Sequence, residues 1–195
     1  MRVRAVVWIL FASAGLASAQ VAELSISGGV SRFGNASLGN TVDQSGNPVA
    51  VTIDNGFRLT FRFTLNTYRF MGHEFGYGYN HSNLIIAAAK SSMPIHQGFY
   101  NFLVYATPEG SRIRPFATGG VQFTSFVPPG ASVYSGTEVT KFGVNYGGGI
   151  KFKLTDILGL RFDFRQYNTG KPFNLPDQNG RLNQMEVSVG AAFMF

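Results

Sequence analysis

Large apolar side chains recur at every second position in several segments of this chain, with polar or small residues between them. The clearest case is residues 57–66, where Phe57, Leu59, Phe61, Phe63 and Leu65 alternate with Arg58, Thr60, Arg62, Thr64 and Asn66. Such alternation predicts a β-strand with one apolar and one polar face. The pattern recurs, less cleanly in some segments, and predicts eight strands at residues 24–31, 57–66, 74–80, 100–105, 114–123, 142–154, 160–165 and 186–195.

The connections between these strands alternate in length. Long ones rich in Gly, Ser, Asn and Pro lie at 34–55, 82–95, 124–139 and 168–182, and short ones at 67–72, 107–112 and 155–158. An up-and-down transmembrane barrel shows this alternation, because its long loops face the medium and its tight turns face the periplasm. A soluble β-sandwich, the alternative, gives no reason for it. The run Leu84 to Ala89 stays open: it is an apolar loop that contacts lipid or a partner, or it continues the neighbouring strands.

Residues 1–19 have the composition of an export signal. Arg2 and Arg4 precede an apolar run from Val6 to Leu16, and residues 17–19 form the small-x-small pattern of a cleavage site. That run is too short for a membrane-spanning helix, which needs roughly 20 apolar residues. We therefore expect a cleaved signal over residues 1–19 and one domain over 20–195. No later stretch is long enough for such a helix, which leaves a closed barrel as the way to cross a membrane.

Charge and cysteine content narrow the possible partners. The formal net charge is +6, and it falls to +4 when Arg2 and Arg4 leave with the signal. The basic residues are spread singly along the chain, so we expect no nucleic-acid binding. The chain has no cysteine, which excludes disulfides and the lipid-modified cysteine of a lipoprotein. A ladder of hydrogen-bonded strands suits an exported domain without disulfides.

Several strands together resemble the outer-membrane β-barrel families of the OmpA/OmpX type, over nearly all of the chain after the signal. The resemblance rests on residues 114–120, 145–152 and 159–165, and on a terminal pattern formed by Val187, Val189, Ala191, Phe193 and Phe195. It implies an all-β, eight-stranded antiparallel up-and-down barrel in the lipid of a bacterial outer membrane. It also implies that the barrel-assembly machinery reads the terminal pattern during biogenesis. We expect a monomer without an appended peptidoglycan-binding domain.

The polar faces of the predicted strands carry many charges. An eight-stranded barrel is about wide enough inside for its own side chains. The inward charges should therefore pair across the lumen, because an unpaired buried charge is costly. We expect a structural network that plugs the barrel; the alternative is a narrow channel or binding site that favours anions. Its predicted members are Arg58, Arg62, Glu74, Arg114, Lys151, Arg161, Asp163, Arg165 and Glu186, with Lys153 nearer the periplasmic end.

Signals for catalysis or for cofactors are weak. Lipid A deacylases are barrels in which a catalytic His and Ser lie two residues apart on one strand face. Here His81 and Ser82 are adjacent, so a regular strand points them to opposite faces. His73 and His96 are isolated, which argues against a metal site. The run Gly147 to Gly149 lacks the Lys-Ser/Thr of a phosphate-binding loop, and more simply makes room for long lumen side chains or curvature.

Three classes of function follow from this sequence. The first is a non-enzymatic barrel with a structural or surface-interaction role, whose loops at 35–54 and 125–141 are the natural contact surfaces. The second is a narrow anion-biased channel, and the third is a lipid A-modifying enzyme. We expect the first, with no enzymatic activity and no cofactor; the sequence does not specify an extracellular partner.

Overall fold

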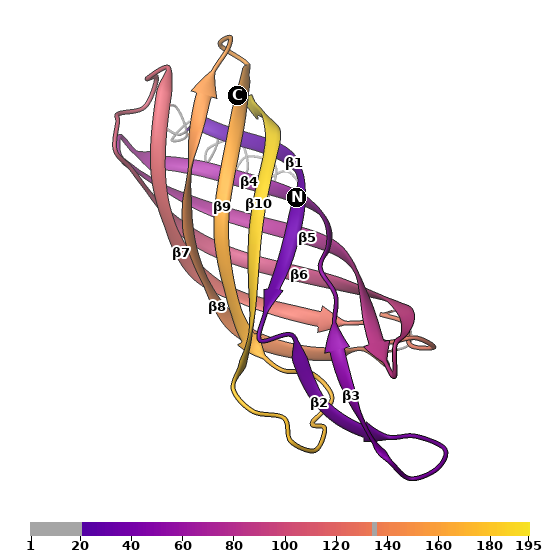
Figure 1. Ribbon diagram of the computed structural model, residues 1–195. Coiled ribbons are helices and arrows are strands. Elements are labelled where there is room, and N and C mark those ends of the chain that lie inside the picture. The colour runs from indigo at the N-terminus through magenta and orange to yellow at the C-terminus, as the bar shows by residue number, and fades with distance from the viewer. Residues whose placement is uncertain (1–20, 134–135) are drawn as a thin grey trace, which may run out of the picture.

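All strands of the structure belong to one antiparallel sheet that closes on itself (Figure 1). The computed structural model describes residues 21–133 and 136–195. Eight strands form the barrel in the order β1-β4-β5-β6-β7-β8-β9-β10, with β10 paired to β1, which confirms the predicted fold class. The strands are β1 (Val21–Gly34), β2 (Ser37–Val42), β3 (Pro48–Ile53), β4 (Gly56–Tyr68), β5 (Met71–Ile86), β6 (Ala89–Tyr105), β7 (Ile113–Phe126), β8 (Val139–Lys153), β9 (Leu158–Gly170) and β10 (Arg181–Met194).

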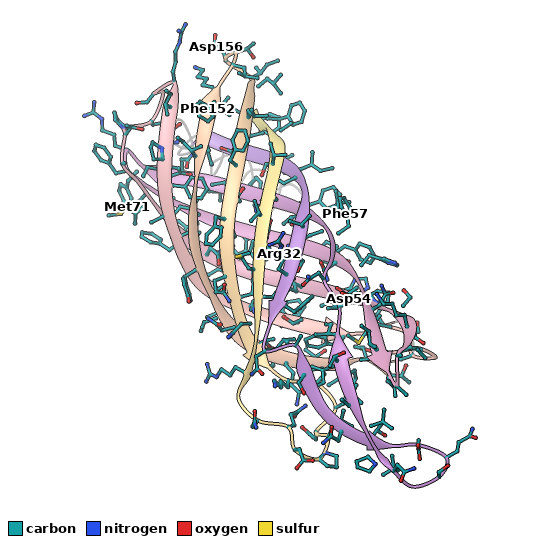
Figure 2. All side chains as sticks on the ribbon, in the orientation of Figure 1. Arg32, Asp54, Phe57, Met71, Phe152 and Asp156 are labelled. Atoms are coloured by element: carbon teal, nitrogen blue, oxygen red, sulfur yellow. The ribbon has the colours of Figure 1, made fainter. Side chains whose placement is uncertain are left out.

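The barrel is polar inside and apolar outside. On β4, Arg58, Thr60, Arg62 and Thr64 are buried, whereas Phe57 is 56% exposed. Figure 2 shows Phe57 and Met71 pointing away from the wall on opposite sides of the barrel. The alternation read from the sequence is the alternation of the two faces of each strand. This arrangement is the reverse of a soluble core and suits surrounding hydrocarbon.

Within residues 21–133 and 136–195, no helix is long and apolar enough to cross a membrane. The predicted signal, residues 1–19, lies outside the described residues. The two marked chain ends lie toward the end of the barrel that carries the short turns, which are residues 69–70, 106–112 and 154–157 (Figure 1). We call this the short-turn end, and the opposite one the long-loop end.

Two of the predicted long loops contain strands. The segment 34–55 holds the hairpin of β2 and β3, which leaves the barrel at the long-loop end (Figure 1). The prediction of a loop at 82–95 is wrong, because β5 and β6 pair continuously up to a turn at Ala87 and Ala88. Both alanines have positive φ, 50° and 68°, as a two-residue hairpin turn of this hand requires. The ambiguous run Leu84 to Ala89 therefore mostly continues the two strands.

An apolar cluster fills the long-loop end of the lumen and explains these extra strands. At this end the inward positions change from polar to apolar. The alternation in the sequence therefore ends there, although the strands continue. We call this cluster the apolar cap. Its buried members are Leu38, Val51, Ile53, Leu84, Met93, Ile95, Phe126 and Leu182.

The loop at 171–180 is fastened over the exposed edge of β2. The Lys171 Nζ donates to Ser37 O at 2.5 Å, and Gln178 Nε2 donates to Leu38 O at 2.9 Å. The backbone N–H of Asn40 donates to Pro176 O at 2.9 Å. These bonds occupy backbone groups that would otherwise be open to pairing with another strand. The hairpin and this loop thus form one ordered structure above the barrel.

Overpacking at Gly76 should be destabilising. Gly76 faces the lumen on β5, and the ring of Phe99 lies where its Cβ would be. We expect Gly76→Val to lower the free energy of unfolding by about 1–3 kcal/mol, because the ring must move within a packed interior. Urea titration in lipid vesicles measures this. Gly119→Ala is the control, since the nearest atom to its added Cβ is 3.8 Å away; equal effects would show a loosely packed lumen.

Candidate functional site in the barrel lumen

All nine charged residues predicted for the lumen lie inside the barrel. Each is at most 7% exposed, and the central ones are essentially inaccessible. Regular alternation places them there, since each lies on the strand face opposite to an exposed apolar residue. They divide into a central network of seven, which consists of Arg58, Arg62, Glu74, Arg161, Asp163, Arg165 and Glu186, and a pair nearer the short-turn end, Arg114 and Lys151.

Glu186 on β10 holds one half of the central network. Its Oε1 accepts from Arg62 Nη2 at 2.6 Å, and its Oε2 lies 2.9 Å from Arg58 Nε. The Tyr167 hydroxyl and the Ser188 hydroxyl also donate to it, each at 2.6 Å. One carboxylate is therefore shared by two arginines from β4 and is saturated with donors, which favours a stable buried charge.

Asp163 and Glu74 hold the other half. Asp163 receives two hydrogen bonds from Arg161, at 2.8 and 3.0 Å, and lies 2.9 Å from Arg165 Nη2. Glu74 lies across the lumen on β5, 2.6 Å from Arg161 Nη2 and 2.8 Å from Arg165 Nη2. Arg62 links the two halves, since its Nη1 is 3.7 Å from Asp163 Oδ2. The network thus ties β4, β5, β9 and β10 together through the barrel interior.

Arg114 and Lys151 each form an ion pair with a carboxylate outside the central network. Lys151 Nζ donates to Glu23 Oε2 at 2.7 Å, and Arg114 Nη1 lies 2.8 Å from Glu109 Oε2. Glu23 is buried on β1, and the sequence prediction did not include it among the lumen charges. Extending the first strand by one residue finds it, because Glu23 shares the face of Ser25 and Ser27.

Aromatic side chains fill much of the remaining lumen. Tyr105, Phe116 and Tyr167 are buried, and the guanidinium of Arg58 lies 4.6 Å from the Tyr167 ring centroid. Arg165 lies 5.6 Å from the Phe99 ring centroid. The sequence prediction gave these rings no part in the site. Stacked rings exclude water and stabilise the cations, so the lumen is filled by charge pairs and rings together.

The structure separates the residues considered for catalysis. His81 is exposed on the outer face of β5, whereas Ser82 is buried inside and its Oγ accepts from Asn80 Nδ2 at 2.5 Å. A nucleophile and its base need to share hydrogen-bond distance, and these two side chains lie on opposite sides of the wall. In the part of the chain that the structure describes, no group of three His, Cys, Asp or Glu side chains could hold a metal ion.

The glycines at 147–149 allow close packing inside the wall. A Cβ on Gly149 would meet the Phe116 ring at 2.6 Å, and one on Gly147 would meet the backbone of β9. The Phe116 ring and the backbone of β9 occupy the space that side chains at these positions would need. The sequence had predicted long basic side chains or curvature there; Gly78 on β5 is the position where a Cβ would meet the guanidinium of Arg58.

One ion pair lies outside the barrel wall, at the long-loop end. Lys90 Nζ donates to Asp54 Oδ2 at 2.8 Å, and both side chains are partly exposed. This hydrogen bond, together with the N–H of Asn55, holds the pKa of the Asp54 carboxyl below its usual 3.8. A lowered carboxyl pKa contributes stability at neutral pH that is lost as the pH falls through that value. Solvent screening keeps the contribution small.

The five residues of the predicted terminal pattern lie on the outer face of the last strand or directly after it. Val187, Val189, Phe193 and Phe195 are exposed, and Ala191 is half-buried between them. The backbone N–H of Phe195 donates to Ala22 O at 2.9 Å, so the final residue still closes the ladder between β10 and β1. Its ring is free of the barrel interior, and its role in assembly stays a prediction.

Comparison with known proteins gives the same architecture. The family model described as "Outer membrane protein beta-barrel domain" matches residues 5–195. The fold is similar to Neisserial surface protein A (TM-score 0.58, 12% identity, covering 90% of this chain and 97% of that one). It is also similar to OprG from Pseudomonas aeruginosa (TM-score 0.55, 13% identity, 89% and 95%). Ail of Yersinia pestis gives a TM-score of 0.51 at 12% identity, with 90% and 99% covered. No curated protein sequence matches the chain.

These similarities of fold agree with the apolar exterior and the polar lumen. The family match indicates the bacterial outer membrane as the location of the barrel. The match of a family model to nearly the whole chain, joined to eight closed antiparallel strands, gives the assignment: the chain belongs to the outer-membrane β-barrel family.

Proposed function

We propose that this protein is a non-enzymatic, non-conducting outer-membrane barrel that presents a rigid platform for contact at the cell surface. The observation that carries the proposal is the apolar cap. Its buried side chains come from β2, β3, β5, β6, β7 and β10, so one cluster both fills the lumen end and fixes the projecting hairpin.

The lumen supports a closed barrel. Permeating ions would have to pass side chains such as Met93, Ile95 and Phe126, which are 0% exposed, and then the central network of paired charges. These side chains belong to wall strands that pair along their length, and not to a hinged loop. Opening a path would therefore mean breaking either a dry cluster or buried ion pairs.

The platform supports surface contact. Hydrogen bonds fasten the loop at 171–180 to β2, and Leu175 and Phe173 pack against the apolar cap. A preorganised surface binds a partner with a smaller entropic cost than a loose loop does. Among the similar structures, Ail is described as an attachment invasion locus protein and was solved with a heparin analogue. A contact role is thus in keeping with a barrel of the same fold.

Planar-bilayer recording tests the closed lumen. We expect the purified barrel to give no discrete current steps in symmetrical potassium chloride, because the cap and the network occupy the path. Protein-free detergent is the blank, and folded insertion is verified by heat-modifiable migration on a gel. Reproducible steps with anion selectivity would contradict the proposal and favour the narrow channel instead.

Shortening the hairpin tests the surface role. Asn40 and Ala50 are directly opposed between β2 and β3, so replacing residues 41–49 by Asn-Gly gives a tight turn that keeps Leu38 and Val51 in the cap. We expect cells that express this variant to adhere less to a cultured epithelial monolayer than cells with the unaltered barrel. Leu154→Ser, at the opposite end, is the control. Equal adhesion by all three would end the platform hypothesis.

A further inference from the structure

The short-turn end of the barrel holds a cavity that the closed lumen does not explain. Its volume is about 210 Å³, which is room for several water molecules. Its polar lining consists largely of charged groups: Arg114, Lys151 and Lys153 with Glu23, Glu109 and Asp156. We call it the vestibule. It lies at the end that the alternation of loop lengths assigns to the periplasm.

Three basic side chains lie side by side at the inner wall of this end. Arg114 on β7 is directly opposite Lys151 on β8, and Lys151 is directly opposite Arg161 on β9. All three point into the barrel and are buried. Neighbouring cations on adjacent strands repel one another and concentrate positive potential at one place.

The carboxylates near these basic side chains leave one edge of the Arg114 guanidinium without a partner. Glu23 forms an ion pair with Lys151 at 2.7 Å, and Asp156 forms one with Lys153 at 2.8 Å. Glu109 lies 2.8 Å from Nη1 of Arg114. Among the described residues, Nε and Nη2 of Arg114 have no hydrogen-bond acceptor, although the side chain is only 6% exposed. Buried donors of this kind normally have a partner.

Nε and Nη2 form the side edge of a guanidinium, the fork whose two parallel N–H bonds match a carboxylate or a phosphate. The guanidinium carbon of Arg114 lies 3.6 Å from the centroid of the Tyr105 ring, so the ring packs against the guanidinium and helps to hold it in place. The Tyr105 hydroxyl also accepts from Lys151 Nζ at 3.1 Å, which fixes the second cation beside the first.

We propose that the vestibule binds a small oxyanion, a phosphate or carboxylate group, on the Nε–Nη2 fork of Arg114 with Lys151 beside it. Glu109 competes with the ligand, since it is the carboxylate already on Arg114. It lies in the turn at 106–112 and its side chain is 30% exposed, so it can move aside. The oxyanion is either a free periplasmic solute or the headgroup phosphate of an inner-leaflet lipid.

Titration with inorganic phosphate in maltoside micelles tests the site, with the Arg114 Nε–Hε resonance and the amides of Gly110 and Ser111 observed by NMR. We expect a saturable shift of these signals. Arg114→Gln should weaken binding about tenfold or more, as expected when a bidentate, charge-assisted contact is lost. Arg112→Gln is the matched control, because Arg112 is exposed and does not line the vestibule.

Glu109→Gln keeps the test decisive even if Arg114→Gln fails to fold. Removing the competing charge should tighten phosphate binding, and a substitution in this partly exposed turn should leave the strands of the barrel intact. A headgroup source would show itself as the same Arg114 shift in phosphatidylglycerol nanodiscs without added phosphate, which also supports the site. The absence of a saturable shift in both systems, or binding that Arg114→Gln and Arg112→Gln weaken equally, would overturn the proposal.

Discussion

Replacing Glu186 by Gln should lower the free energy of unfolding by about 3–5 kcal/mol, the range for breaking a buried ion pair by removal of one partner. The substitution keeps the shape of the side chain, so the loss is one of charge. It leaves Arg58 and Arg62 without the carboxylate that lies 2.9 and 2.6 Å from them. Urea-induced unfolding in lipid vesicles, followed by aromatic fluorescence or by gel migration, measures the change.

A second substitution separates lost charge pairing from lost packing. Adding Arg58→Met to Glu186→Gln removes one of the stranded cations, so the double variant should regain part of the lost stability. Such coupling is the signature of residues in one network. Asp54→Asn is the surface control, because its pair with Lys90 is partly exposed and screened. A cost for Glu186→Gln no larger than that of the control would mean that water solvates the lumen charges, contrary to the filled interior.

Replacing Phe195 by Ala should sharply reduce the amount of barrel assembled in cells while leaving folding in vesicles almost unchanged. The Phe195 ring is 70% exposed, and only its backbone N–H bonds to β1. Its removal therefore disturbs few contacts within the folded barrel. By resemblance, we expect the barrel-assembly machinery to recognise this aromatic residue. Folded and unfolded protein in outer-membrane fractions are quantified by heat-modifiable migration.

Leu154→Ala is the matched control for this effect. Leu154 is 61% exposed at the same end of the barrel, so its loss removes apolar surface without changing the terminal pattern. We expect normal assembly of this variant in cells and similar refolding of both variants in vesicles. If both variants assemble equally in cells, the terminal pattern has no special role, and Phe195 contributes only ordinary contact with lipid.

The sequence predicted the strands best where one face of a strand is apolar and the other is polar. Phe57 to Asn66 alternates because its two faces meet different surroundings, and the structure gives β4 this orientation over its length. The same rule placed the nine lumen charges inside the barrel. It failed at 82–95, because there the inward residues become apolar while the strands continue. Leu84, Met93 and Ile95 face one another within the cap, and a pattern in one segment does not reveal partners from five other strands.

The existence of the eight barrel strands, and the direction of the side chains where apolar and polar residues alternate, follow from local patterns that depend only on neighbouring residues. The sequence alone thus determined an apolar exterior and a charged lumen for this barrel. The partners of those charges were decided by the tertiary structure, because Glu74 meets Arg161 and Glu23 meets Lys151 only after the sheet has closed. Closure also created the apolar cap and left the fork of Arg114 without an acceptor. Contacts across a lumen join residues far apart in the chain, and no spacing along the sequence encodes them.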